Sequence, residues 1–103
     1  MNIPVPWTID IQPTAAPAVF QPSELTVQVN DQIHWANLDN VNKHWPGLVV
    51  KDVIQEKYFF PEPIDENEPS DTWTPKDPGT YTYRCSLHSH ESPATIVVTA
   101  VPA

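Results

Sequence analysis

Short runs in which every second residue is apolar recur along the first half of the chain. This alternation occurs in residues 7–11, 25–29 and 33–35. It places every second side chain on the same face. A period of two is the spacing of a half-buried β-strand. The pattern therefore predicts three strands here, with His34 on the outer face of the third.

The second half continues in the same way. Tyr81, Tyr83 and Cys85 alternate with polar residues, so we expect all three to face inward and the thiol to lie at the end of a buried strand. Residues 95–101 are rich in β-branched side chains and predict the last strand. Residues 48–50 and 71–74 predict further strands, and residues 52–57 a short helix.

These elements predict an all-β fold, a Greek-key β-sandwich of seven or eight short strands. The 13 prolines and 2 glycines agree with it, because proline disfavours long helices and suits stiff loops. At 103 residues the chain has enough sequence for one packed core, so we expect a single domain over residues 1–103.

Charge excludes one class of partner. A net charge of −8 argues against nucleic acid, whose phosphates require lysine and arginine. Such acidity suits a basic protein partner. The acidic loop at residues 62–71 is the natural place for that contact, although a solvated loop explains the same residues. No apolar run approaches the length of a membrane span.

The candidate chemistry lies in the last third of the chain. Cys85, the single cysteine, is followed three residues later by His88, and His44 stands upstream. One tight turn can present the sulfur and the imidazole to a single metal ion. A thiolate with two imidazoles suits copper in an electron-transfer site, although zinc accepts the same donors. An unreactive buried cysteine is the plain alternative, and a Cys–His nucleophile pair fits the strand-end position less well.

Two blocks of sequence resemble the cupredoxin, or type 1 copper, family. The first reads Phe20-x-Pro22-x-x-Leu25-x-Val27-x-x-Asn30-Asp31-x-Ile33-x-Trp35-x-Asn37 and leads to His44. The second reads Pro78-Gly79-Thr80-Tyr81-x-Tyr83-x-Cys85-x-x-His88. The resemblance implies a β-sandwich that holds one copper ion, cycling between Cu(I) and Cu(II), through His44, Cys85 and His88.

The axial ligand departs from the family pattern. Family loops commonly place a methionine three to five residues after the second histidine, where this chain has Glu91, Ser92 and Pro93. The only methionine is Met1. In this respect the chain resembles the purple or red members of the family, some of which have an open coordination position. His90 and Glu91 are the candidate axial ligands.

The resemblance also implies what surrounds the ligands. In the family, the residue before the first histidine and its loop often brace the cysteine sulfur through backbone hydrogen bonds, and here that residue is Lys43, beside Asn42. Trp45, Pro46 and Leu87 flank the ligands and are candidates for an apolar docking patch, with ordinary loop packing as the alternative.

Three functions remain open at this stage. The first is an electron carrier that exchanges electrons with a redox protein, and it is favoured over an enzyme. The second is a copper site whose open axial position binds or oxidises a small molecule such as nitric oxide. The third is a copper-delivery or storage module with a looser site that includes His90 and Glu91. Residues 1–4 lack the pattern of a signal peptide, so the protein is either cytosolic or a mature domain with an added methionine. The family implies a periplasmic or other extracytoplasmic location, which favours the second.

Overall fold

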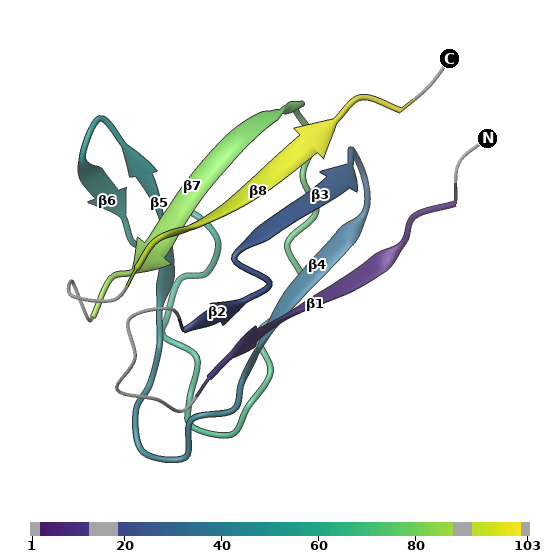
Figure 1. The fold of residues 1–103 in the computed structure, drawn as a ribbon. Helices are drawn as coiled ribbons and strands as arrows, with labels where there is room; N and C mark the ends of the chain where they lie inside the picture. Colours follow the sequence, from purple (N-terminus) through teal and green to yellow (C-terminus); the bar gives the residue numbers. More distant parts are fainter. Residues whose placement is uncertain (1–2, 13–18, 88–91, 102–103) are drawn as a thin grey trace.

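The computed structural model of the chain describes residues 3–12, 19–87 and 92–101. Within these ranges the secondary structure consists of eight strands and no helix, as Figure 1 shows. The strands are β1 (Pro6–Ile11), β2 (Phe20–Gln21), β3 (Glu24–Gln28), β4 (Gln32–Asn37), β5 (Pro46–Val50), β6 (Val53–Gln55), β7 (Gly79–Cys85) and β8 (Ala94–Thr99). No helix in this part of the chain could cross a lipid bilayer.

The strands form two sheets that pack face to face (Figure 1). One sheet has the order β2-β1-β4, and the other has the order β3-β8-β7-β5-β6. The pairs β1–β4 and β3–β8 are parallel, and the other pairs are antiparallel. The prediction of an all-β sandwich with seven or eight strands is confirmed.

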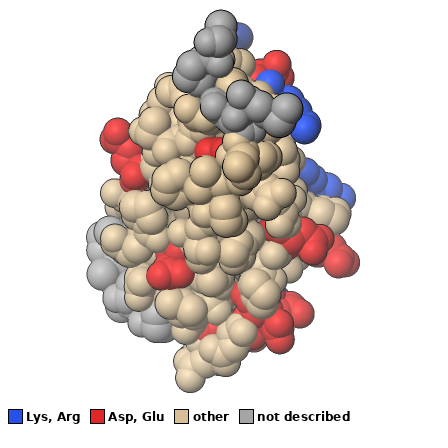
Figure 2. Space-filling model, turned by 90° about the vertical axis from the view of Figure 1, so that its right-hand side faces the viewer, with Lys and Arg blue, Asp and Glu red and all other residues tan. Residues whose placement is uncertain are grey.

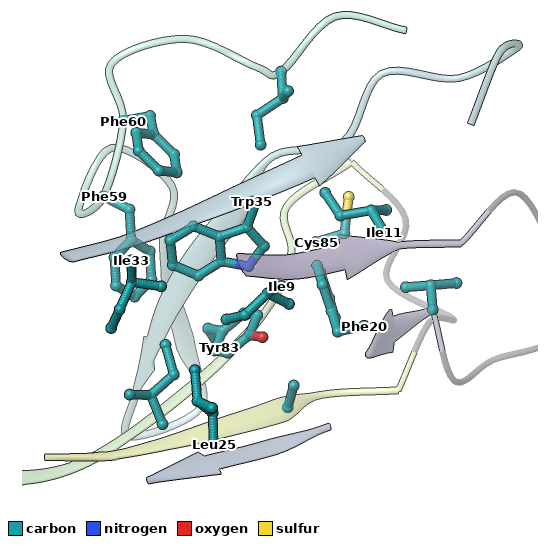
Figure 3. Packing of buried hydrophobic residues seen from close by; sticks show 14 of the residues in the cluster. Ile9, Ile11, Phe20, Leu25, Ile33, Trp35, Phe59, Phe60, Tyr83 and Cys85 are labelled. Carbon is teal, nitrogen blue, oxygen red and sulfur yellow. The ribbon is translucent and has the colours of Figure 1, made fainter. Parts of the chain in front are cut away.

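Side chains predicted to face inward fill the space between the sheets. Trp35, Tyr83 and Phe20 are buried and stack edge to face, with ring centroids 5.4 Å apart for Trp35 and Tyr83 and 4.8 Å apart for Phe20 and Tyr83. Figure 3 shows these rings in the same cluster as Cys85. Burial raises the pKa of Tyr83 far above its usual range, so this phenol stays neutral. The strand that ends in the cysteine is therefore anchored in the core.

Two local predictions were wrong. Residues 52–57 do not form a helix, because Val50 pairs with Val53 and the chain reverses through Lys51 and Asp52. Both of these residues have positive φ, 50° and 65°, as a two-residue turn of a twisted hairpin requires. Residues 71–74 do not form a full strand either. Trp73 makes only an isolated bridge to Ile33 at the outer edge of β4.

Candidate metal centre

His44 is held in a buried position by main-chain pairing. It lies in the loop between β4 and β5, and only 1% of its surface is exposed. Its backbone forms an antiparallel bridge with Ile64, with N···O distances of 3.2 Å from the His44 nitrogen and 2.8 Å from the Ile64 nitrogen. A loop residue pinned in this way keeps its imidazole in a fixed place.

Cys85 ends β7 and is fully buried. Cys85 pairs with Pro46 in the neighbouring strand β5. His44 precedes Pro46 by two residues in the sequence. The Trp45 N–H donates to the Cys85 Sγ at 3.4 Å, and the Ser86 N–H donates to the Trp45 carbonyl at 2.8 Å. The β5–β7 pairing thus brings two of the three predicted ligands to one end of the sheet.

The amide at the sulfur comes from an unexpected residue. We expected Lys43, before the histidine, to brace the sulfur, but the observed donor is Trp45, after it. The side chain of Lys43 points to the surface instead, where its Nζ lies 3.1 Å from Asp65 Oδ1. The Trp45 N–H therefore helps to fix the position of the sulfur at the end of β7.

Asp39, a buried carboxylate that the sequence analysis did not single out, lies beside the imidazole of His44. Asp39 Oδ2 lies 3.1 Å from His44 Nε2 and accepts the Asn42 Nδ2–H at 3.2 Å. Asp39 Oδ1 accepts the backbone N–H groups of Val41 at 2.9 Å and Asn42 at 3.1 Å. Burial alone raises the pKa of this carboxyl, but the hydrogen bonds from Val41, His44 and Asn42 outweigh burial and lower the pKa to about 2.

Asn37 completes this polar network from the end of β4. Its Oδ1 accepts the Asp39 N–H at 3.0 Å. Its Nδ2 donates to the carbonyls of Asn42 at 3.0 Å, Asp65 at 3.1 Å and Ile64 at 3.3 Å. The only sequence signal for this network was an Asn-x-Asp pair a few residues before the candidate ligand, which on its own is too common to be informative.

The remaining predicted ligands lie outside the described residues. These are His88 and the two candidate axial ligands, His90 and Glu91. No group of three or more His, Cys, Asp or Glu side chains suited to a metal occurs within residues 3–12, 19–87 and 92–101. His34 lies on the outer face of the smaller sheet, as predicted, with its Nε2 3.4 Å from Thr8 Oγ1.

The candidate apolar patch is only partly exposed. Pro46 is buried, and Trp45 is partly buried with its Nε1–H donated to the Phe60 carbonyl at 3.1 Å. Leu87 is 46% exposed. The loop that carries His44 adds two apolar side chains that the sequence analysis did not include, Leu38 at 46% and Val41 at 71% exposed.

The acidic loop lies beside the His44 segment, because Ile64 pairs with His44. It lines a surface hollow of about 330 Å³ with the carboxylates of Glu62, Asp65, Glu68 and Asp71. Figure 2 shows separate groups of Asp and Glu side chains scattered from the top to the bottom of one face, whereas the Lys and Arg side chains visible there lie in its upper half.

Comparisons with known proteins agree with this architecture. The sequence matches no family model and no curated protein. The fold is similar to a purple cupredoxin from Nitrosopumilus maritimus, with a TM-score of 0.73 and 21% identity over 89% of this chain and 98% of the other. It is also similar to an amicyanin variant in the Cu(I) state, with a TM-score of 0.69 and 23% identity over 93% of this chain and 82% of the other.

A larger protein contains a related domain. A copper-containing nitrite reductase from Thermus scotoductus matches all of this chain with 24% of its own length, at a TM-score of 0.70 and 23% identity. The similarity thus extends from proteins of about this length to part of a much longer chain. This chain has the cupredoxin fold.

Proposed function

We propose that the chain is a one-electron carrier that binds a single copper ion through His44, Cys85 and His88. The observation that carries this proposal is the pairing of Cys85 with Pro46, which sets a buried thiol beside the loop of a buried histidine. His88 follows the thiol by three residues, within reach of the same ion. We also propose that residues 1–103 act as one copper-binding domain.

The donor set fits copper. One thiolate and two imidazoles match the trigonal sites in which copper transfers electrons. When bound, copper would supply a couple between Cu(I) and Cu(II), and a fixed donor set suits both states. Here the Trp45 N–H holds the sulfur, and the main-chain bridge to Ile64 holds the histidine. These contacts would limit rearrangement when the charge of the site changes.

The surroundings favour a protein partner over a buried substrate. Leu38, Val41 and Leu87 are exposed in the segments that carry His44 and Cys85, and apolar contact allows two redox proteins to approach closely. The carboxylates that line the hollow next to Ile64 would attract a redox protein with a basic face. A periplasmic or other extracytoplasmic location is part of the same proposal.

A second candidate function is binding or oxidation of a small molecule, such as nitric oxide, at an open axial position of the copper. The observation that favours it is the absence of methionine at residues 91–93, where the resemblance places the axial ligand. Glu91 and His90 are the proposed alternatives for that position. A carboxylate ligand would favour Cu(II), whereas an empty apolar position would favour Cu(I).

The visible absorption spectrum of the Cu(II)-loaded protein tests both functions. An intense thiolate-to-copper band that does not respond to azide supports the carrier, and a band that moves with azide supports the open site. His44→Ala and Cys85→Ser should abolish the band. His34→Ala is the matched control, because His34 lies on the outer face of the sheet, and it should leave the band intact. Absence of the band in the unaltered protein would refute copper–thiolate binding.

A further inference from the structure

The contact between Asp39 and His44 has the form of a carboxylate that orients a ligand. Both side chains are buried, with side-chain exposures of 7% for Asp39 and 2% for His44, and the two atoms are 3.1 Å apart. We propose that Asp39 is a positioning residue that keeps a proton on His44 Nε2 and so makes Nδ1 the metal-binding nitrogen. This inference rests on the proposed role of His44 as a copper ligand.

The hydrogen bonds to Asp39 leave it no role other than acceptor. Oδ1 receives two backbone N–H groups, from Val41 and Asn42, and Oδ2 receives the amide of Asn42. Three N–H donors directed at its two oxygens favour the ionised carboxylate. Because an ionised carboxylate can only accept, the His44 nitrogen that faces it has to donate. A neutral His44 then carries its lone pair on Nδ1.

Hydrogen bonds from neighbouring segments hold Asp39 and His44 in this arrangement. Asn37 Oδ1 accepts the backbone N–H of Asp39, and Asn37 Nδ2 donates to the carbonyls of Asn42 and Ile64. Since Ile64 also bridges the backbone of His44, the acceptor and the imidazole are attached to the same frame. A hydrogen bond at the non-coordinating nitrogen fixes the ring orientation of a metal-binding histidine and raises its basicity.

Asp39→Asn is the informative variant, because it changes the hydrogen-bonding role without changing the shape. The two backbone N–H groups at Oδ1 still need an acceptor, so the new amide nitrogen takes the place of Oδ2. It then donates to His44 Nε2, which has to accept, and the proton moves to Nδ1. Copper binding at Nδ1 would require the proton to return to Nε2, against another donor.

The experiment combines two readouts. Long-range ¹H–¹⁵N NMR of the metal-free protein, labelled at histidine, reports the tautomer of His44 directly. We expect the proton on Nε2 in the unaltered protein and on Nδ1 in Asp39→Asn. Competition with a Cu(I) chelator then reports affinity, and we expect Asp39→Asn to bind copper about 10- to 100-fold more weakly. Asn42→Ala is the matched control, since it removes a different bond to Oδ2, and it should preserve the Nε2–H tautomer.

Several results would overturn the inference. A proton on Nδ1 in the unaltered metal-free protein would do so without any variant, even if Asp39→Asn failed to fold. An unchanged tautomer of His44 in folded Asp39→Asn would also overturn it. So would a changed tautomer in a variant whose copper affinity stays within about twofold of that of the unaltered protein. The NMR result is independent of copper, so a protein that binds no copper would refute the proposed function and still leave the tautomer measured.

Discussion

Two buried carboxylates, Asp31 and Asp39, lie at opposite ends of the sandwich, and they differ in what they bind. Asp31, 4% exposed, accepts the backbone N–H groups of Val5 and Gln28 and the indole N–H of Trp7, each at 3.0 Å. Asp39, 5% exposed, accepts backbone and amide N–H groups as well, but it also contacts His44 Nε2. Each carboxylate stabilises a turn next to β4.

The difference lies in whether the partner can change state. A backbone amide and an indole are always donors, so the three bonds of Asp31 only hold the N-terminal strand against the turn at residues 28–31. An imidazole donates or accepts, and it can bind a metal. A carboxylate of the same burial therefore has a structural role at one end and, by our proposal, an additional role in ligand orientation at the other.

The largest effect expected from this comparison is on stability at the Asp31 end. Asp31→Ala removes three hydrogen bonds, so it should lower the free energy of unfolding by about 3 kcal/mol. Urea denaturation of the metal-free protein measures this loss. Copper affinity of the folded variant should be unchanged. A loss of affinity as large as that of Asp39→Asn would contradict the division of roles.

Acidification should reduce the contributions of both Asp31 and Asp39 to the stability of the fold. For Asp39 the pKa is about 2 in the folded state against 3.8 for the unfolded chain, so its contribution is complete above pH 3.8 and is lost as the pH falls toward 2. This depression of the pKa corresponds to about 2 kcal/mol. Burial raises the pKa of Asp31, but the bonds from Gln28, Val5 and Trp7 outweigh burial and lower it, which gives the same sign.

Denaturation of the metal-free protein between pH 2 and pH 7 checks this expectation. The unaltered protein should lose stability on acidification more steeply than Asp39→Asn, which lacks the titrating group. Asp31→Asn is the corresponding variant at the other end of the molecule. Equal pH dependence in all three proteins would show that neither carboxylate contributes to stability through its charge.

Substitution of the two glycines by alanine should have different effects at the two ends of the sandwich. An added Cβ at Gly47 would lie 2.6 Å from Ser86 Oγ and 2.8 Å from Ile54 Cγ2, so Gly47→Ala should cost about 1 to 2 kcal/mol. It should also shift the visible band of the copper-loaded protein, because Gly47 lies two residues from the amide at the sulfur. Gly79→Ala, at the other end of β7, meets no close atom but has a φ of +152°. It should cost about 1 kcal/mol and leave the band unchanged.

The smallest effect is expected for the exposed ion pair near the loop that carries His44, which is the proposed ligand loop. Lys43 and Asp65 have side-chain exposures of 54% and 64%, and solvent screens pairs of this kind. Lys43→Ala should leave the midpoint of thermal unfolding unchanged. A clear drop in that midpoint would show that the surface pair supports the ligand loop as much as the buried carboxylate does.

The fold was predictable where a local pattern determines it. Alternation in residues 7–11, 25–29, 33–35 and 81–85 identified four strands, because a sandwich requires one face of each strand to be apolar. The failure at residues 52–57 has a local cause. Lys51 and Asp52 adopt positive φ, but neither is the glycine or asparagine that usually marks such a turn. The sequence therefore did not indicate a hairpin at this position.

The site was predictable only in part, for a different reason. His44 and Cys85 were predicted to be ligands from residue types, spacing and resemblance, and the pairing of β5 with β7 brings their segments to one end of the sheet. The roles of Asp39 and Asn37 were missed because they depend on a contact between loops. Asn37 reaches the carbonyls of Ile64 and Asp65, about 28 positions away in sequence, and no local pattern encodes such a contact.

The ends of the described chain have a practical consequence for attaching this molecule to a solid support. Ile3 and Val101 line the same small hollow as Asp31. Figure 1 shows that β1 begins and β8 ends at the same end of the sandwich. β7 runs from Gly79 near that end to Cys85 at the other, a span of about 20 Å for seven residues of strand. A linker at either end, on an electrode or a bead, would thus orient the thiol end away from the support and toward the solution.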